Sequence, residues 1–287
     1  MIRSYSAFAS KSFTQPSTIS PLLKLLPPYS LIEWFNDRGS ANNRLSAYLG
    51  SNPLDLRNTL FDRASINHIN ELIHSSPPSA VLLSAVATDQ SIIHPENPSP
   101  LRCINTSKTK LVIDETMTGF GRLGSGTMFS YEAHRLEPDV ILIATEDAYG
   151  IVELDHRQSI TDSSRAQHLA DVCYTANYFR HTLSASLIDR HQTVREVSGR
   201  GFLMFLHLEI SPRISLGKII GEKYQGWFRG PWNAGDAGGP VEERHSPLTN
   251  NRPDSTVTIM PPLDSTIEEI DEFSAAMHEA LSKLSNL

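Results

Sequence analysis

The sequence predicts an α/β domain followed by a smaller α+β domain, and three observations lead to this prediction. Continuous apolar runs occupy residues 79–87, 109–115 and 138–145, which is typical of strands buried on both faces of a parallel sheet. A short helical pattern at 127–136 lies between the last two runs, as in a βαβ unit. After about residue 160 longer amphipathic segments replace this alternation, so the chain divides there into two units.

One helix and a polar tail are predicted ahead of these strands. Residues 65–75 place four apolar side chains on one helical face. Residues 1–28 are rich in serine and contain no acid, since the first is Glu33; this composition resembles a mitochondrial transit peptide or a disordered tail. We therefore expect the folded chain to begin near residue 29, with the large α/β domain extending over 29–160.

The second unit, residues 161–287, is predicted to contain two long helices and two strands. Apolar residues spaced three and four apart predict an amphipathic helix at 163–190. The final helix is predicted to begin at a capping box formed by Ser265 and Glu268. The strands are expected at 201–210 and 255–263, with an exposed loop rich in Gly, Pro and Asn at 229–255.

Composition restricts the classes of function. Hydrophobic residues make up 39% of the 287 and charged residues 20%, as in a globular protein with its own core. The formal charge of −7 gives no electrostatic reason to expect nucleic acid. No apolar run approaches the roughly 20 residues that span a bilayer. With only Cys103 and Cys173 we expect no disulfide framework, and therefore a cytoplasmic location, with mitochondria as the alternative given the N-terminal composition.

The main candidate for a functional group is Asp114, at the predicted carboxyl end of the strand 109–115. Ligands of open α/β sheets bind beyond this end of the strands. One interpretation is a Walker-B-like acid that holds magnesium, but the chain has no G-x-x-x-x-G-K-[ST] phosphate loop to accompany it. No histidine and cysteine set has zinc spacing, so no metal site is predicted.

A second interpretation explains more residues. The segment IDETMTGFGRLGSGTMFSYEAHRLEPDVILIA (113–144) resembles the Asp-Glu-Val-x-Thr-Gly-Phe-Gly-Arg-Thr-Gly region of class III (ornithine/omega-amino acid type) pyridoxal-phosphate-dependent aminotransferases. VREVSGRGFLMFLHLEI (194–210) and IMPPLDSTIEEIDEF (259–273) look like the start and the end of that family's small domain. FNDRGSANNRLSAYLG (35–50) is similar to its Gly-Ser-Glu-Ala-Asn turn with one residue missing.

The resemblance implies fold type I, with a shortened large domain of mainly parallel sheet and a small α+β C-terminal domain. It also implies pyridoxal 5′-phosphate as a possible cofactor, which acts as an electron sink when its ring nitrogen is protonated. Asp114 would be the carboxylate that faces this nitrogen, and Thr116 would occupy the position of the residue that packs on the ring. Gly39 and Ser40 would supply backbone donors to the phosphate.

The chain departs from the family at the residue that matters most for catalysis. Alignment without gaps places Thr145 where the family has the lysine that forms the Schiff base and moves the proton. The seven lysines are at 11, 24, 108, 110, 218, 223 and 283, so none falls between 111 and 217. We therefore assign no catalytic residue, and any bound cofactor is expected to be held without a covalent link.

Two functions remain open. In the first the chain is a class III aminotransferase-like protein that, if active, transfers amino groups between a small amine or amino acid and an oxo acid. In the second it is a catalytically inactive relative that acts as a binding or regulatory partner. Relatives of this class are dimers, so we expect a homodimer or pairing with a homologue. Neither nucleic acid nor membrane is expected as a partner.

Overall fold

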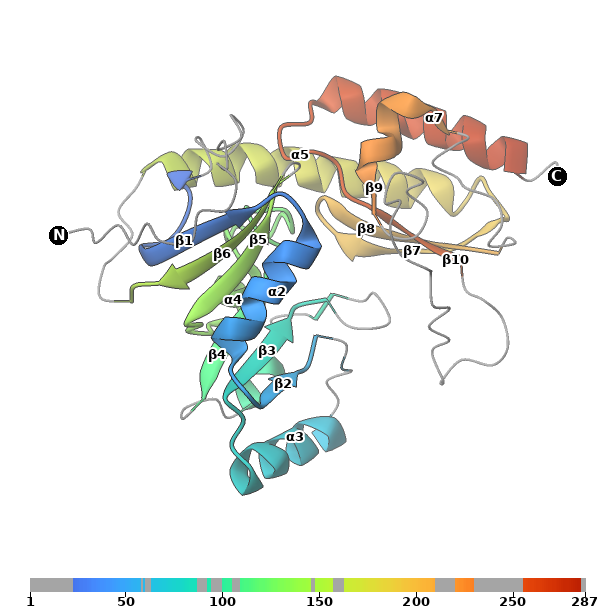
Figure 1. Ribbon diagram of the computed structural model, residues 1–287. Helices are drawn as coiled ribbons and strands as arrows, with labels where there is room; N and C mark the ends of the chain where they lie inside the picture. The colour runs from blue at the N-terminus through green and yellow to red at the C-terminus, as the bar shows by residue number, and fades with distance from the viewer. Residues whose placement is uncertain are drawn as a thin grey trace.

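The computed structural model describes residues 23–57, 59, 63–86, 92–93, 100–104, 109–145, 148–156, 163–209, 220–229 and 255–284. It contains a six-stranded and a four-stranded sheet, with one long helix running along both (Figure 1). The elements in chain order are β1 (Tyr29–Phe35), α2 (Arg38–Leu49), β2 (Pro53–Asp55), α3 (Arg63–Ser75), β3 (Ala80–Ser84), η1 (Pro100–Cys103), β4 (Lys110–Asp114), α4 (Ser130–His134), β5 (Val140–Ala144), β6 (Tyr149–Leu154), α5 (Ser163–Leu187), β7 (Val194–Arg200), β8 (Leu203–Leu208), η2 (Glu222–Trp227), β9 (Phe228–Arg229), β10 (Ser255–Ile259) and α7 (Ile267–Leu284).

The larger sheet has the strand order β1-β6-β5-β4-β3-β2. Strands β2, β3, β4 and β5 pair in parallel, whereas β6 runs antiparallel to both of its neighbours, β5 and β1. The three predicted apolar strands are β3, β4 and β5, and they form the centre of this sheet. The mainly parallel α/β domain predicted from the sequence is therefore confirmed.

Both faces of this sheet are covered, which explains why its central strands are apolar along their whole length. On one face α2 packs through Leu45 and Leu49 against the sheet. On the other face lie α3 and α4, through Ile69, Ile73 and Tyr131 among others. Helix α2 buries only a narrow stripe of side chains, those of Ala41, Leu45 and Leu49. Its N-terminus reaches the carboxyl ends of β4 and β5 (Figure 1).

The smaller sheet is antiparallel, with the order β7-β8-β10-β9. Helices α5 and α7 pack on it around an aromatic cluster in which Phe273 contacts Phe179, Trp227 and Phe228. The predicted strands at 201–210 and 255–263 and both long helices are confirmed. The expected loop at 229–255 lies outside the described residues apart from its two ends.

Two local predictions need correction. The capping box of α7 is formed by Thr266 and Glu269, one residue later than predicted: the Thr266 hydroxyl accepts from the Glu269 amide at 3.2 Å, and the Glu269 carboxylate accepts from the Thr266 amide at 2.9 Å. Near the other end of the chain, Leu25 and Leu26 are buried in the core of the larger sheet. Packed structure therefore begins before residue 29.

Candidate functional site

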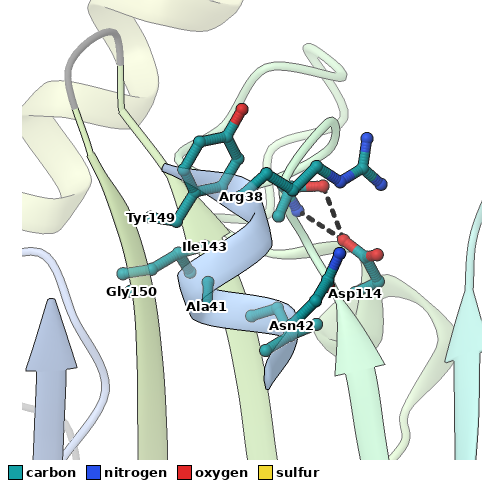
Figure 2. Close-up of a pocket in the computed structure, with 9 residues that line it drawn as sticks. Arg38, Ala41, Asn42, Asp114, Ile143, Tyr149 and Gly150 are labelled. Carbon is teal, nitrogen blue, oxygen red and sulfur yellow. Dashed lines mark hydrogen bonds between the residues drawn. The ribbon is translucent and has the colours of Figure 1, made fainter. Parts of the chain in front are cut away.

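A small pocket lies at the carboxyl ends of β4 and β5, beneath the N-terminus of α2, where an open α/β sheet binds its ligands. Figure 2 shows the Arg38 side chain extending across it, above Asp114. Its volume is about 10 Å³, close to the space that one water needs. The lining residues are Arg38, Ala41, Asn42, Asp114, Thr116, Leu142, Ile143, Tyr149 and Gly150.

Asp114, the last residue of β4, is 7% exposed and has donors on both carboxylate oxygens. Its Oδ1 accepts from the amide of Thr116 at 3.1 Å and from the Thr116 hydroxyl at 2.6 Å (Figure 2). Its Oδ2 accepts from Nη1 of Arg57 at 3.1 Å. The two predicted residues Asp114 and Thr116 are thus brought together, and a guanidinium that sequence analysis did not select lies beside them.

Arg57 is held in this position by a second carboxylate. Its Nη2 donates to Oδ2 of Asp55 at 2.7 Å and its Nε donates to Oδ1 at 3.0 Å. Burial raises the pKa of Asp55, but the hydrogen bonds from Arg57 outweigh it and the net shift is downward. The hydrogen bond with Asp55 raises the pKa of Arg57, and the charge of Asp114 adds to this effect. One cation therefore bridges two carboxylates at the ends of β2 and β4.

The N-terminus of α2 contains the predicted phosphate donors Gly39 and Ser40, neither of which lines the pocket. Asp37 is the N-cap residue of this helix. Its Oδ1 accepts from the amide of Ser40 at 2.7 Å, and its Oδ2 accepts from the Ser40 hydroxyl at 2.7 Å. The amide hydrogen bond is the main reason that the pKa of Asp37 is lowered. Both donors of Ser40 are thus occupied by a carboxylate of the chain itself.

Thr145 begins the connection between β5 and β6 and does not line the pocket. Its hydroxyl accepts from the amide of Ala148 at 3.1 Å, and its own amide donates to the Ala148 carbonyl at 2.8 Å. Ala144 pairs with Tyr149, and β6 runs antiparallel to β5 along the sheet. The Thr145 side chain is therefore engaged in a hydrogen bond with Ala148.

None of the four described lysines, Lys24, Lys110, Lys223 and Lys283, lines the pocket. Lys110 is at the opposite end of β4 from Asp114, about 13 Å away along the strand. Lys223 pairs with Glu272, and Lys283 pairs with Glu279 on α7.

Glu115, the second acid of the motif, has a structural role. It is 1% exposed, and its carboxylate accepts from the amides of Ser130 and Tyr131 at 3.0 and 2.9 Å and from the hydroxyls of Ser130 and Thr118. These amides open α4, whose first N–H groups have no partner within the helix. Burial raises the pKa of Glu115, and the four hydrogen bonds oppose that shift. Glu115 therefore fixes the start of α4 against the end of β4.

Of the two residues that the sequence analysis did not select, Asp37 could have been predicted from the sequence and Arg57 could not. Asp37, three residues before Ser40, has the spacing of a helix N-cap and could have been identified. Arg57 carries no sequence signal, because its contact with Asp114 spans 57 positions and depends on the order of β2, β3 and β4. Across the described ranges there is neither a cluster of three metal-ligating side chains nor a helix long and apolar enough to cross a membrane.

Comparison with known proteins finds similar proteins by structure only. No family model matches the sequence, and no curated protein does. A Toxoplasma gondii ornithine aminotransferase, whose active site holds PLP at partial occupancy, matches with a TM-score of 0.59 at 13% identity, over 90% of this chain and 73% of that one. The ornithine δ-aminotransferase of Plasmodium falciparum matches with a TM-score of 0.58 at 17% identity, over 89% of this chain and 74% of that one.

A phospholyase from Arthrobacter, solved with phosphoethanolamine, matches with a TM-score of 0.56 at 14% identity, over 92% of this chain and 79% of that one. The chain therefore has the fold of the class III, fold type I aminotransferases, and the fold expected from the motif resemblance is confirmed. At these identities the fold is what the proteins share.

Proposed function

We propose that this chain is a class III aminotransferase-like protein that has kept the fold of these enzymes without their covalent chemistry. The proposal is supported by Thr145: an alignment of the motif without gaps places it at the lysine position, and its hydroxyl accepts a hydrogen bond from the amide of Ala148. A hydroxyl cannot form an imine, and near neutrality it is a very poor general base. Losing a positioned base alone lowers a rate by roughly 10²–10⁴.

Pyridoxal phosphate is a possible cofactor for a chain of this fold, held without a covalent link. Asp114 and Thr116 would face its ring, and it would supply an electron sink. The arrangement of the described residues does not fit it, however. The pocket of about 10 Å³ has room for roughly one water, and both oxygens of Asp114 already have donors. We therefore derive no catalytic step through this group.

A site of this kind is compatible with a non-catalytic binding partner. The edge of the larger sheet is a surface through which such a partner could bind. Among the described strands, β1 is at the edge of the larger sheet and has β6 as its one neighbour. Unpaired edges favour addition of another chain. Tyr29, at the start of β1, is 37% exposed. We propose self-association or pairing with a homologue through this region.

Borohydride reduction in the presence of pyridoxal phosphate, followed by peptide mass spectrometry, tests the loss of covalent chemistry. We expect scattered, substoichiometric adducts on exposed lysines, whereas an intact ornithine aminotransferase treated in parallel should give one stoichiometric site. A stoichiometric pyridoxyl adduct on a single lysine, together with amino transfer between ornithine and an oxo acid, would refute the proposal. Light scattering tests the assembly, and a stable monomer at micromolar concentration would contradict it.

A further inference from the structure

Resting on the proposed function, we infer that the chain itself supplies both charges that a pyridinium phosphate would bring to this site. Arg57 neutralises Asp114 in place of a ring nitrogen, and Asp37 occupies the N-terminus of α2 in place of a phosphate. The pocket at β4 and β5 is thus an internally compensated structural element, complete without a ligand.

The first half of the inference rests on the burial of Asp114. A carboxylate that is 7% exposed needs a counter-charge, because removing it from water without one is strongly unfavourable. Arg57 provides this charge with its Nη1, while its Nε and Nη2 are fixed by Asp55. A cationic ring that approached Asp114 would meet a guanidinium of the same sign that is held on two sides.

The second half rests on the first turn of α2. Unpaired amides and the helix dipole make such a turn a natural site for an anion. Here the anion is the Asp37 carboxylate, which takes the amide and the hydroxyl of Ser40 at 2.7 Å each. A phosphate at this turn would meet a carboxylate of the same sign and would find these two donors occupied.

If the site is complete without a ligand, the folded protein should not bind a cofactor analogue, and its stability should depend on Arg57. The probe is 4′-deoxypyridoxine 5′-phosphate, which keeps the ring nitrogen and the phosphate but has no aldehyde. At about 1 mM it should leave the Tm of the full-length chain unchanged, because only a ligand that binds the folded state raises the Tm. Since this probe cannot form an imine, its result is independent of the borohydride test of the proposed function.

Arg57→Gln should lower the Tm by roughly 4–8 °C, because it leaves Asp114 buried without a counter-charge. The matched control is Arg44→Gln, which breaks the exposed pair between Arg44 and Glu33 and should shift the Tm by about 2 °C or less. The double variant Arg57→Gln/Asp114→Asn should recover part of the loss, since the uncompensated charge is gone. If Arg57→Gln does not fold while the double variant does, the failure to fold is itself the penalty of the uncompensated Asp114 charge, and the double variant compared with Asp114→Asn alone should show only a small loss.

Two results would overturn the inference. One is a saturable rise in the Tm of the unaltered chain with the probe, abolished by Asp114→Asn, which would show that Asp114 accepts a pyridinium despite Arg57. The other is an Arg57→Gln variant as stable as the Arg44→Gln control. An unresponsive unaltered chain, a destabilised Arg57→Gln variant and partial recovery in the double variant would together support it.

Discussion

Replacing Gly201 with alanine tests how the two sheets are joined. Gly201 lies between β7 and β8 with φ +59°, a left-handed conformation. A Cβ at this position would lie 2.3 Å from the carbonyl oxygen of Arg122 and 2.6 Å from the carbonyl carbon of Leu123, in the loop after β4. The neighbouring amide of Phe202 donates to the same Arg122 carbonyl at 2.8 Å. A methyl group here must therefore push apart backbone that connects the two sheets.

The free energy of unfolding should fall by about 2–5 kcal/mol. The left-handed conformation costs an L-residue about 1–2 kcal/mol, and forcing extra volume into packed structure costs about 1–3 kcal/mol. Gly126→Ala is the matched control, because Gly126 has φ +78° but nothing within 4 Å of its added Cβ. The control should lose only the conformational term, and the lower entropy of the unfolded chain reduces the loss of both variants equally, by about 0.4–1 kcal/mol, which leaves their difference unchanged.

Equilibrium urea unfolding of the unaltered chain and the two variants measures the difference, with the midpoints compared at equal m-values. We expect Gly201→Ala to be less stable than Gly126→Ala by about 1–3 kcal/mol, the contribution of the overlap alone. Equal stability of the two variants within about 0.5 kcal/mol would refute the close approach of the β7–β8 turn to the loop after β4.

Three further predictions concern the site, the stability of α4 and the response to pH. Glu115→Ala should lower the free energy of unfolding by about 2–4 kcal/mol in urea unfolding, because it leaves buried amides of α4 without an acceptor, whereas Glu137→Ala on the surface should have little effect. Burial lowers the pKa of His191 and of His278, whose ring nitrogens are 2.7 Å apart, below the ordinary 6.5. The unfolded chain then binds more protons, so the Tm should fall as the pH drops through about 6.5, and His278→Asn should flatten this dependence; a pH-independent Tm would contradict it. Thr145→Lys should yield no stoichiometric pyridoxyl adduct in borohydride mass spectrometry, since Arg57 still holds Asp114, and a full-yield adduct would show that the pocket is intact.

Part of this fold was predictable from local sequence, whereas β1, α2, β2, β6 and β7 were not predicted. Strands β3, β4 and β5 follow from runs of apolar residues, and α5 and α7 follow from apolar spacing. The strand end at Asp114 followed from the same pattern. These features depend on residues that are neighbours in the chain, so their signal lies within one window of sequence. The capping box of α7 was predicted one residue too early, because Ser265 and Thr266 are both residue types that favour the N-cap position. Only the observed start of the helix distinguishes them.

The character of the site was decided by the tertiary structure. The motif predicted that the Asp114 carboxylate faces a cofactor. The sequence placed Asp114 at the end of its strand but did not predict that Arg57 would pair with it. Arg57 reaches Asp114 only because β2, β3 and β4 lie side by side, and the sequence carries no local record of that order. An ion pair depends on distances of a few ångströms between segments far apart in the chain, whereas a periodic pattern needs only its own residues. That is why the sequence by itself determined the central strands β3, β4 and β5 and the long helices α5 and α7, and the three-dimensional arrangement alone decided which charges meet.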